Sequence, residues 1–132
     1  MTRKSFAAPG AAAIGPYSHA CAGGGLVFLS GQTPLDPATG QLAEGGIEAQ
    51  TRRCFQNLFE VLRASGLTPD DVVNVQVFLV DMADFAVYNN TYAEYFTDRA
   101  PTRTTVAVRE LPHPDLLIEI QAVAYKPGAS DD

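Results

Sequence analysis

Two charged side chains lie inside segments that are otherwise apolar and strand-like. Arg103 opens one of these segments, and Glu119 stands between Ile118 and Ile120 in another. An arginine held on a rigid element can form paired hydrogen bonds with a planar carboxylate. A glutamate in a partly dry pocket has a raised pKa, which is typical of functional sites. Each residue also has a simpler interpretation: a surface arginine at the start of a strand, and a solvated glutamate that points outward.

Other polar residues could support these two without defining a reaction themselves. Thr105 shares a strand face with Arg103, because strand residues two apart point the same way. Asn89 stands beside the apolar stripe of a predicted helix, where a cap or a boundary hydrogen bond is its simplest role. Tyr17 and Ser30 are uninformative when taken singly. None of these residues identifies a function alone.

The sequence lacks the patterns of several kinds of catalytic site. The two histidines, His19 and His113, are far apart, and there is no HExxH, CxxC, GxGxxG or P-loop pattern. Ser18 and His19 are adjacent, which orients their side chains apart and makes them a poor nucleophile–base pair. Cys54 falls on the apolar stripe of a predicted helix and is expected in the core. We therefore expect no metal and no organic cofactor.

The composition predicts a folded single domain over residues 1–132. Apolar residues make up 46% of the chain and charged residues 18%, and the net charge is −6. An acidic chain without a basic patch argues against a nucleic-acid partner. No apolar stretch approaches the roughly 20 residues of a membrane helix. Cys21 and Cys54 have no metal-ligand spacing, so we expect two buried thiols in a reducing cytoplasm.

The hydrophobic pattern predicts an α+β domain in the order strands, helix, strand, helix, strands. Apolar runs predict strands over residues 26–30, 72–80, 103–108 and 116–125. Three- and four-residue spacing predicts a helix from Ile47 to Ser65, closed by Gly66. A second helix is expected after the caps Asp81 and Asp84, with the stripe Phe85, Tyr88, Tyr92 and Phe96 and an end before Pro101.

The predicted strands contain more apolar surface than two helices can cover. The strands around Val27, Val77 and Ile118 are apolar on both faces, whereas two helices can cover one face of a sheet. A second layer must cover the other face, because large apolar patches rarely stay exposed. Another copy of the same chain is the simplest such layer, so we expect a homo-oligomer.

The sequence resembles the RidA/YjgF family, the reactive intermediate deaminases, also described as L-PSP endoribonuclease-like, over nearly its whole length. The order and spacing of many short pieces carry the resemblance. They are Ile14-Gly15-Pro16-Tyr17-Ser18, Ser30-Gly31-Gln32 with Pro34, Gln50 with Asn57-Leu58, Val77-Phe78 with Asp81, Phe85 with Asn89 and Tyr92, Pro101-Thr102-Arg103, and Leu111-Pro112 leading to Ile118-Glu119-Ile120.

The resemblance implies a chorismate-mutase-like fold: a mixed six-stranded sheet with two helices packed on one face. It also implies a homotrimer whose sheets form a central barrel, with active sites in clefts between subunits. In the family, the arginine matching Arg103 clamps the substrate carboxylate and the glutamate matching Glu119 handles the attacking water. The position matching Thr105 offers backbone groups to the imine. The positions matching Tyr17, Ser30, Gly31 and Asn89 line the cleft.

The implied activity is the hydrolytic deamination of small reactive 2-imino or enamine carboxylates of the 2-aminoacrylate and 2-iminopropanoate type, without a cofactor. Two departures from the family stand out: Thr105 replaces the cysteine of the commonest members, and the 97–102 connection is shorter. Other functions to weigh are deamination of a larger, aminomuconate-type enamine, a non-catalytic carboxylate-binding or holdase trimer, and an endoribonuclease or translation inhibitor. The charge of −6 argues against RNA cleavage.

Overall fold

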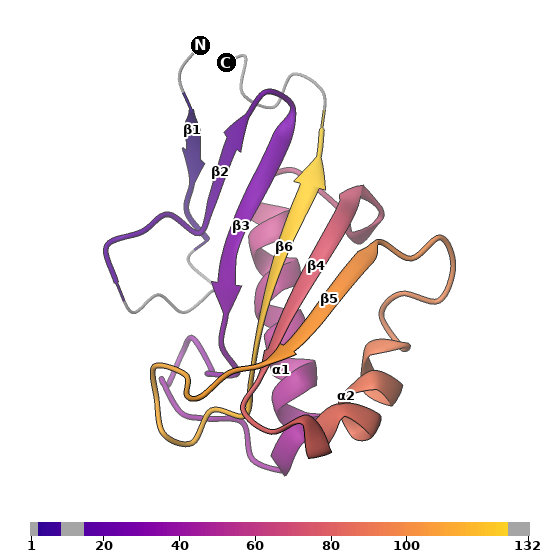
Figure 1. Ribbon diagram of the computed structural model, residues 1–132. Helices are drawn as coiled ribbons and strands as arrows, with labels where there is room; N and C mark the ends of the chain where they lie inside the picture. Colours follow the sequence, from indigo (N-terminus) through magenta and orange to yellow (C-terminus); the bar gives the residue numbers. More distant parts are fainter. Residues whose placement is uncertain (1–2, 9–14, 127–132) are drawn as a thin grey trace.

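The computed structural model describes residues 3–8 and 15–126, which form one mixed sheet covered by helices on a single face (Figure 1). The strands lie in the order β1-β2-β3-β6-β4-β5. Only the β4–β5 pair is parallel within this sheet. The elements are β1 Lys4–Phe6, β2 Ala20–Gly23, β3 Leu26–Gln32, α1 Gly46–Ala64, β4 Val72–Leu79, α2 Phe85–Tyr92, β5 Thr102–Ala107 and β6 Ile118–Tyr125.

Helix α1 confirms the helix predicted from the spacing of apolar residues. Its buried stripe includes Cys54, Leu58 and Leu62 and packs against β6 and β3. Gly66 has a φ of +76°, a left-handed conformation that glycine adopts without steric cost. The turn is closed by hydrogen bonds from the Gly66 N–H to Arg63 O (3.0 Å) and from the Leu67 N–H to Leu62 O (2.9 Å).

Helix α2 begins as the sequence predicts and is shorter than its apolar stripe. A 3₁₀ turn, Met82–Asp84, precedes it, and the Asp81 carboxylate accepts a hydrogen bond from the Ala83 N–H (2.9 Å). Tyr88 and Tyr92 are buried, as the stripe predicts. Phe96 lies beyond the end of the helix at Tyr92, and its ring still packs on Tyr92 at 5.3 Å.

Strand β6 alternates regularly between the two faces of the sheet. In β6, Ile118 and Ile120 are fully buried under the helices, whereas Glu119 is half-buried on the other face. The sequence missed β1 and β2, because both are short and β2 is built mainly of alanine and glycine. It also set the last strand too early, since β6 begins at Ile118 and not at residue 116.

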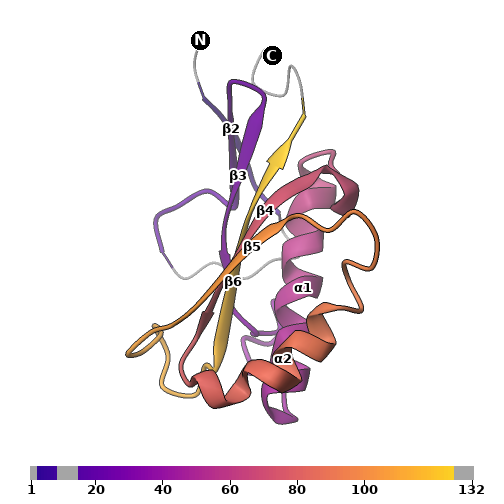
Figure 2. The same cartoon turned by 45° about the vertical axis from the view of Figure 1, so that its right-hand side comes forward.

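The face of the sheet opposite the helices is uncovered. Figure 2 shows the sheet nearly edge-on, with α1 and α2 on one side only. Exposed apolar side chains on this open face include Leu26, Phe28 and Tyr125, of which Phe28 is 49% exposed. The predicted apolar surplus is thus confirmed in the single chain. Within the described residues, no helix is long and apolar enough to cross a membrane.

Candidate active site

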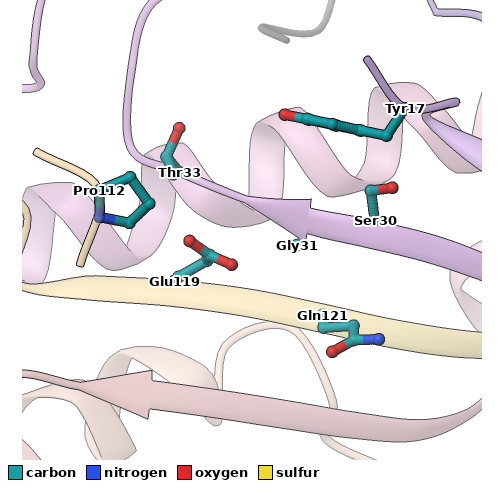
Figure 3. Close-up of a pocket in the computed structure, with 7 residues that line it drawn as sticks. All are labelled: Tyr17, Ser30, Gly31, Thr33, Pro112, Glu119 and Gln121. Carbon is teal, nitrogen blue, oxygen red and sulfur yellow. The ribbon is translucent and has the colours of Figure 1, made fainter. Parts of the chain in front are cut away.

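A cleft of about 410 Å³ lies on the open face of the sheet, where β3 and β6 meet the loop before β6 (Figure 3). It contains four of the residues predicted for the site, Tyr17, Ser30, Gly31 and Glu119. Thr33, Pro112 and Gln121 complete the lining. In Figure 3 the Glu119 side chain stands between Gly31 and Pro112, and the Tyr17 ring extends above β3. The cleft therefore brings a carboxylate together with several hydroxyl groups.

A β-bulge shapes this cleft. Leu29 pairs with Ala122 and Gln32 with Ile120, so Ser30 and Gly31 together face one residue of β6. The Ser30 hydroxyl donates to Ser18 O (2.7 Å), which ties the segment carrying Tyr17 to the bulge. At Gly31, an added Cβ would lie 3.0 Å from Glu119 Cδ and closer still to Oε2. A side chain at position 31 would therefore displace the Glu119 carboxylate from the place it takes beside Gly31.

The electrostatic setting of Glu119 suits a base. Burial raises the pKa of this carboxyl above its ordinary value of 4.5. No cation lies within ion-pair distance of it in the described part of the chain. A carboxylate that is less stabilised in its charged form is a stronger proton acceptor. Glu119 thus points outward from the core, as the simpler interpretation has it, but its side chain is half-buried in the cleft.

Arg103 lies on the other face of the sheet, under helix α2. Its guanidinium carbon stands 4.6 Å from the centre of the Tyr92 ring, 5.4 Å from that of Tyr88 and 5.7 Å from that of Phe85. Its Nη1 donates to Asn89 Oδ1 (2.8 Å). No acidic side chain pairs with it among the residues that the structure describes. The remaining donors of the guanidinium are available to an anion.

Thr105 lies two residues further along the same face. Its hydroxyl and that of Tyr88 are 2.8 Å apart. Strand β5 is the edge of the described sheet, and the Val108 N–H donates to Leu79 O of β4 (2.7 Å). Since alternate residues of an edge strand bond to its neighbour, the backbone groups of Arg103 and Thr105 point to the open edge.

The structure thus brings the predicted residues together in two groups on opposite faces of the sheet. Tyr17, Ser30, Gly31 and Glu119 form one group on the open face. Asn89, Arg103 and Thr105 form the other beside α2. In the shared strand β4, Arg103 pairs with the buried Val75 and Glu119 with Phe78 on the opposite face. One chain alone does not bring the arginine and the glutamate into a common cleft.

Sequence reasoning missed several residues that shape the two groups. The Tyr88 and Tyr92 rings beside Arg103 were assigned to the core stripe, although a four-residue spacing from Tyr88 to Tyr92 was the available signal. Gln121 follows from Glu119 by strand alternation. Thr33 and Pro112 lie in loops, where periodicity carries no information.

The cysteines and histidines are not part of either group. Cys54 is fully buried, and burial raises the pKa of its thiol well above the ordinary value, which confirms its place in the core. Cys21 is half-buried on the open face, so the expectation that both thiols are buried is wrong for this residue. His19 Nδ1 accepts from the Ala8 N–H (2.8 Å). In the described ranges, no three His, Cys, Asp or Glu residues gather as a metal site.

Comparison with known proteins gives consistent matches over most of the chain. The family model described as "Endoribonuclease L-PSP" matches residues 7–126. A RutC family protein of Pyrococcus horikoshii is 49% identical over 113 residues, which are 86% of this chain and 89% of that protein. A 2-iminobutanoate/2-iminopropanoate deaminase of Salmonella typhimurium is 42% identical over 118 residues, with 87% and 91% covered. The crystal structure of the yeast protein YEO7 has a TM-score of 0.90 at 40% identity, covering 95% of this chain and 99% of that one.

Proposed function

Because the chain belongs to the L-PSP endoribonuclease family, also called RidA/YjgF, we propose that it deaminates small 2-imino and enamine carboxylates. The products would be a 2-oxo acid and ammonia. The family's deaminase role is supported by relatives named 2-iminobutanoate/2-iminopropanoate deaminase, at 42% and 41% identity. Compounds of the 2-aminoacrylate and 2-iminopropanoate type carry the planar carboxylate that Arg103 suits.

The observation that carries this proposal is the unpaired charge of Arg103. The guanidinium is half-buried among three aromatic rings, and among the described residues its polar contacts are neutral: the Asn89 amide and the Tyr88 hydroxyl. A cation so placed gains more from an anion than an exposed cation does, because less water screens it. A carboxylate can accept two parallel hydrogen bonds from it, which fixes the orientation of the ligand as well as its charge.

We place the reaction at a junction between two copies of the chain. The Arg103 group and the Glu119 group lie on opposite faces of one sheet, so a site that uses both draws them from different subunits. The apolar open face, with Phe28 and Tyr125, suits burial against a second sheet. Contacts between unlike surfaces that close into a ring give a cyclic oligomer. A trimer with its sheets around a central barrel, and a site at each junction, fits these features.

The chemistry needs one base and one anchor. An enamine is first protonated at carbon and so becomes the iminium ion. Glu119 then takes a proton from water as the water oxygen bonds to C2, and the electrons of the C2–N π bond become the lone pair of an amine. In the resulting carbinolamine, Glu119 returns that proton to nitrogen. The C–N bond then breaks and ammonia leaves with the bonding electrons, while the proton of the C2 hydroxyl passes to the Glu119 carboxylate and C2 becomes a carbonyl. Arg103 holds the carboxylate throughout, which lowers the entropic part of the barrier.

Imine hydrolysis needs only a modest acceleration, which a small set of residues can provide. Imines hydrolyse in water without help, and each tenfold acceleration requires about 1.4 kcal/mol of transition-state stabilisation. Fixed orientation and one general base each contribute several such steps. The backbone groups of Thr105 at the open edge of β5 are suited to bind the imine nitrogen.

A coupled assay tests the proposal. A pyridoxal-phosphate-dependent serine or threonine dehydratase releases the imine, and semicarbazide traps whatever the protein leaves unhydrolysed. We expect catalytic amounts of wild type to suppress trapping. The kcat/KM of Arg103→Ala should be lower by about a hundredfold or more, as expected for the loss of two charge-assisted hydrogen bonds. Arg63→Ala is the matched control, because Arg63 is exposed and pairs with Glu60 on the same helix. Equal trapping with wild type and without protein would withdraw the proposal.

RNA cleavage, which the family description names, has less support in this chain. The net charge of −6 opposes the approach of a phosphate backbone. His19 and His113 belong to distant segments, and His113 Nδ1 accepts from the Asp115 N–H (3.2 Å), so no histidine pair is arranged for acid–base cleavage. The deamination proposal uses the two groups described above, whereas an RNA site does not follow from them.

A further inference from the structure

The hydroxyl groups of Tyr88 and Thr105 form a pair beside the Arg103 guanidinium and have no role in the scheme above. Tyr88 contributes both its ring, 5.4 Å from the guanidinium, and its hydroxyl, 2.8 Å from Thr105 Oγ1. One tyrosine therefore contacts both polar groups that β5 presents to a ligand. We propose that Tyr88 is a positioning residue that directs the Thr105 hydroxyl proton at the C2 oxygen of the bound acid, so that the site prefers 2-oxo acids over carboxylic acids without that oxygen.

The direction of the proton follows from counting donors and acceptors. Tyr88 is 0% exposed, so its hydroxyl has no access to bulk water. In the described part of the chain, Thr105 Oγ1 is the one acceptor within hydrogen-bond distance of the phenol. If Thr105 donated instead, the phenol proton would be buried without a partner, which costs roughly 1–3 kcal/mol. Tyr88 is therefore the donor and Thr105 the acceptor.

Arg103 favours the same direction of the hydrogen bond, from Tyr88 to Thr105. The guanidinium has donors only, so it can approach the phenol oxygen but cannot accept its proton. Burial is the largest effect on the pKa of Tyr88 and raises it against the opposing guanidinium of Arg103, so the phenol keeps its proton at neutral pH. The proton of Tyr88 is thus left with Thr105. A chain of polar groups runs from the guanidinium through the phenol to the Thr105 hydroxyl.

If it accepts the proton of Tyr88, the Thr105 hydroxyl keeps its own proton for another acceptor. Thr105 is half-buried at the edge strand, on the same face as Arg103 and two residues from it. A carboxylate on Arg103 places the C2 substituent beside the anchored group. The oxygen that water adds to C2 during deamination, and that remains in the 2-oxo product, is an acceptor for this proton. The inference thus rests on the proposed function for its ligand class and adds a residue that selects within it.

The test compares two acids that differ at C2 alone. Binding of 2-oxobutanoate and of butanoate to the whole assembled protein is measured by calorimetry, and the ratio of their affinities is taken for each variant. We expect Tyr88→Phe and Thr105→Val each to lower this ratio about three- to tenfold, the value of one neutral hydrogen bond. General damage to the carboxylate site would weaken the binding of both acids equally and leave the ratio of their affinities unchanged.

A double-mutant cycle separates positioning from an independent structural role. If Tyr88 acts through the Thr105 hydroxyl, Tyr88→Phe has no further effect on the ratio in the Thr105→Val background. Thr105→Ser should restore the wild-type ratio, because it keeps the hydroxyl. Tyr95→Phe is the matched control: its ring stacks on Phe55 at 4.3 Å and has no contact with Arg103 or Thr105. Thermal unfolding of each variant shows that it is folded.

The outcomes also distinguish this inference from the proposed function. Additive effects in the cycle, or an unchanged ratio in Tyr88→Phe, would overturn the role of Tyr88 even if the wild type deaminates imines. A ratio that falls as expected in a protein without deaminase turnover would support the Tyr88–Thr105 pair as a selector of 2-oxo acids. In that case the deaminase proposal alone would be withdrawn.

Discussion

Arg103 and Glu119 lie on opposite faces of one sheet, although a single strand, β4, separates the strands that carry them. The register explains this, because Arg103 pairs with Val75 and Glu119 with Phe78, three residues apart. An odd separation along a strand places side chains on different faces. Any reaction that needs both groups then needs two chains, and this has a direct test.

Mixed oligomers of two inactive variants should regain activity. In a ring of three, with each site built from Arg103 of one chain and Glu119 of the next, every mixed trimer of Arg103→Ala and Glu119→Gln has one intact site. Refolding an equal mixture should recover about a quarter of the wild-type activity, since three quarters of the trimers are mixed. The coupled assay measures it, with each variant refolded alone as the control. Persistent inactivity of the mixture would place both groups in the same chain's site.

Gly31→Ala should impair turnover more than folding. The added Cβ would meet the Glu119 carboxyl, which lies at the end of a flexible side chain and can move away. We expect a loss of about tenfold or more in kcat, because a displaced base loses its alignment with the water. Gly23→Ala is the control, since an added Cβ there meets nothing within 4 Å. Equal activity of the two variants would show that the Glu119 position is not critical.

Glu119 should govern the acid limb of the pH profile. As a base it acts when deprotonated, and burial raises its pKa above 4.5. On lowering the pH, kcat/KM should therefore begin to fall at a higher pH than it would for an exposed glutamate.

The same raised pKa of Glu119 should make the folded protein more stable at low pH than at neutral pH. A raised pKa in the folded state favours folding below the unfolded pKa, and this contribution is lost as pH rises through the folded pKa. Glu119→Gln should therefore raise the Tm at neutral pH and change it little near pH 4.

Local sequence patterns predicted both helices and the longer strands, but not the short strands β1 and β2. The stripe through Cys54, Leu58 and Leu62 predicted helix α1, and Gly66 predicted its end. Strand alternation placed Glu119 away from Ile118 and Ile120. These features follow from periodicity and turn chemistry, which a sequence contains directly. The family resemblance supplied the six-stranded sheet that the chain forms.

Relationships between elements could not be predicted in the same way. The split of Arg103 from Glu119 depends on the register of three strands, and no local pattern fixes that register. The bulge at Ser30 and Gly31 changes the pairing of β3 without changing its composition. The Tyr88–Thr105 hydrogen bond joins residues from a helix and a strand 17 positions apart. Such contacts need the packed structure.

Phe28→Asp should dissociate the oligomer into monomers and thereby abolish deaminase activity. Phe28 is 49% exposed on the open face and pairs across the sheet with Val123, so in the proposed trimer its ring is buried between sheets. A charge at a buried apolar contact is strongly unfavourable unless it is paired. Light scattering coupled to size-exclusion chromatography should therefore report a monomer. If each site is shared between two chains as proposed, that monomer should not deaminate imines.

Val87→Asp is the control for this last prediction. Val87 is 45% exposed on α2, on the helix side of the sheet, so it matches Phe28 in exposure but lies away from the open face. We expect it to leave the oligomer and most of the activity intact. A Phe28→Asp monomer that keeps full activity would instead show that each chain contains a complete site, in spite of the positions of Arg103 and Glu119 on opposite faces.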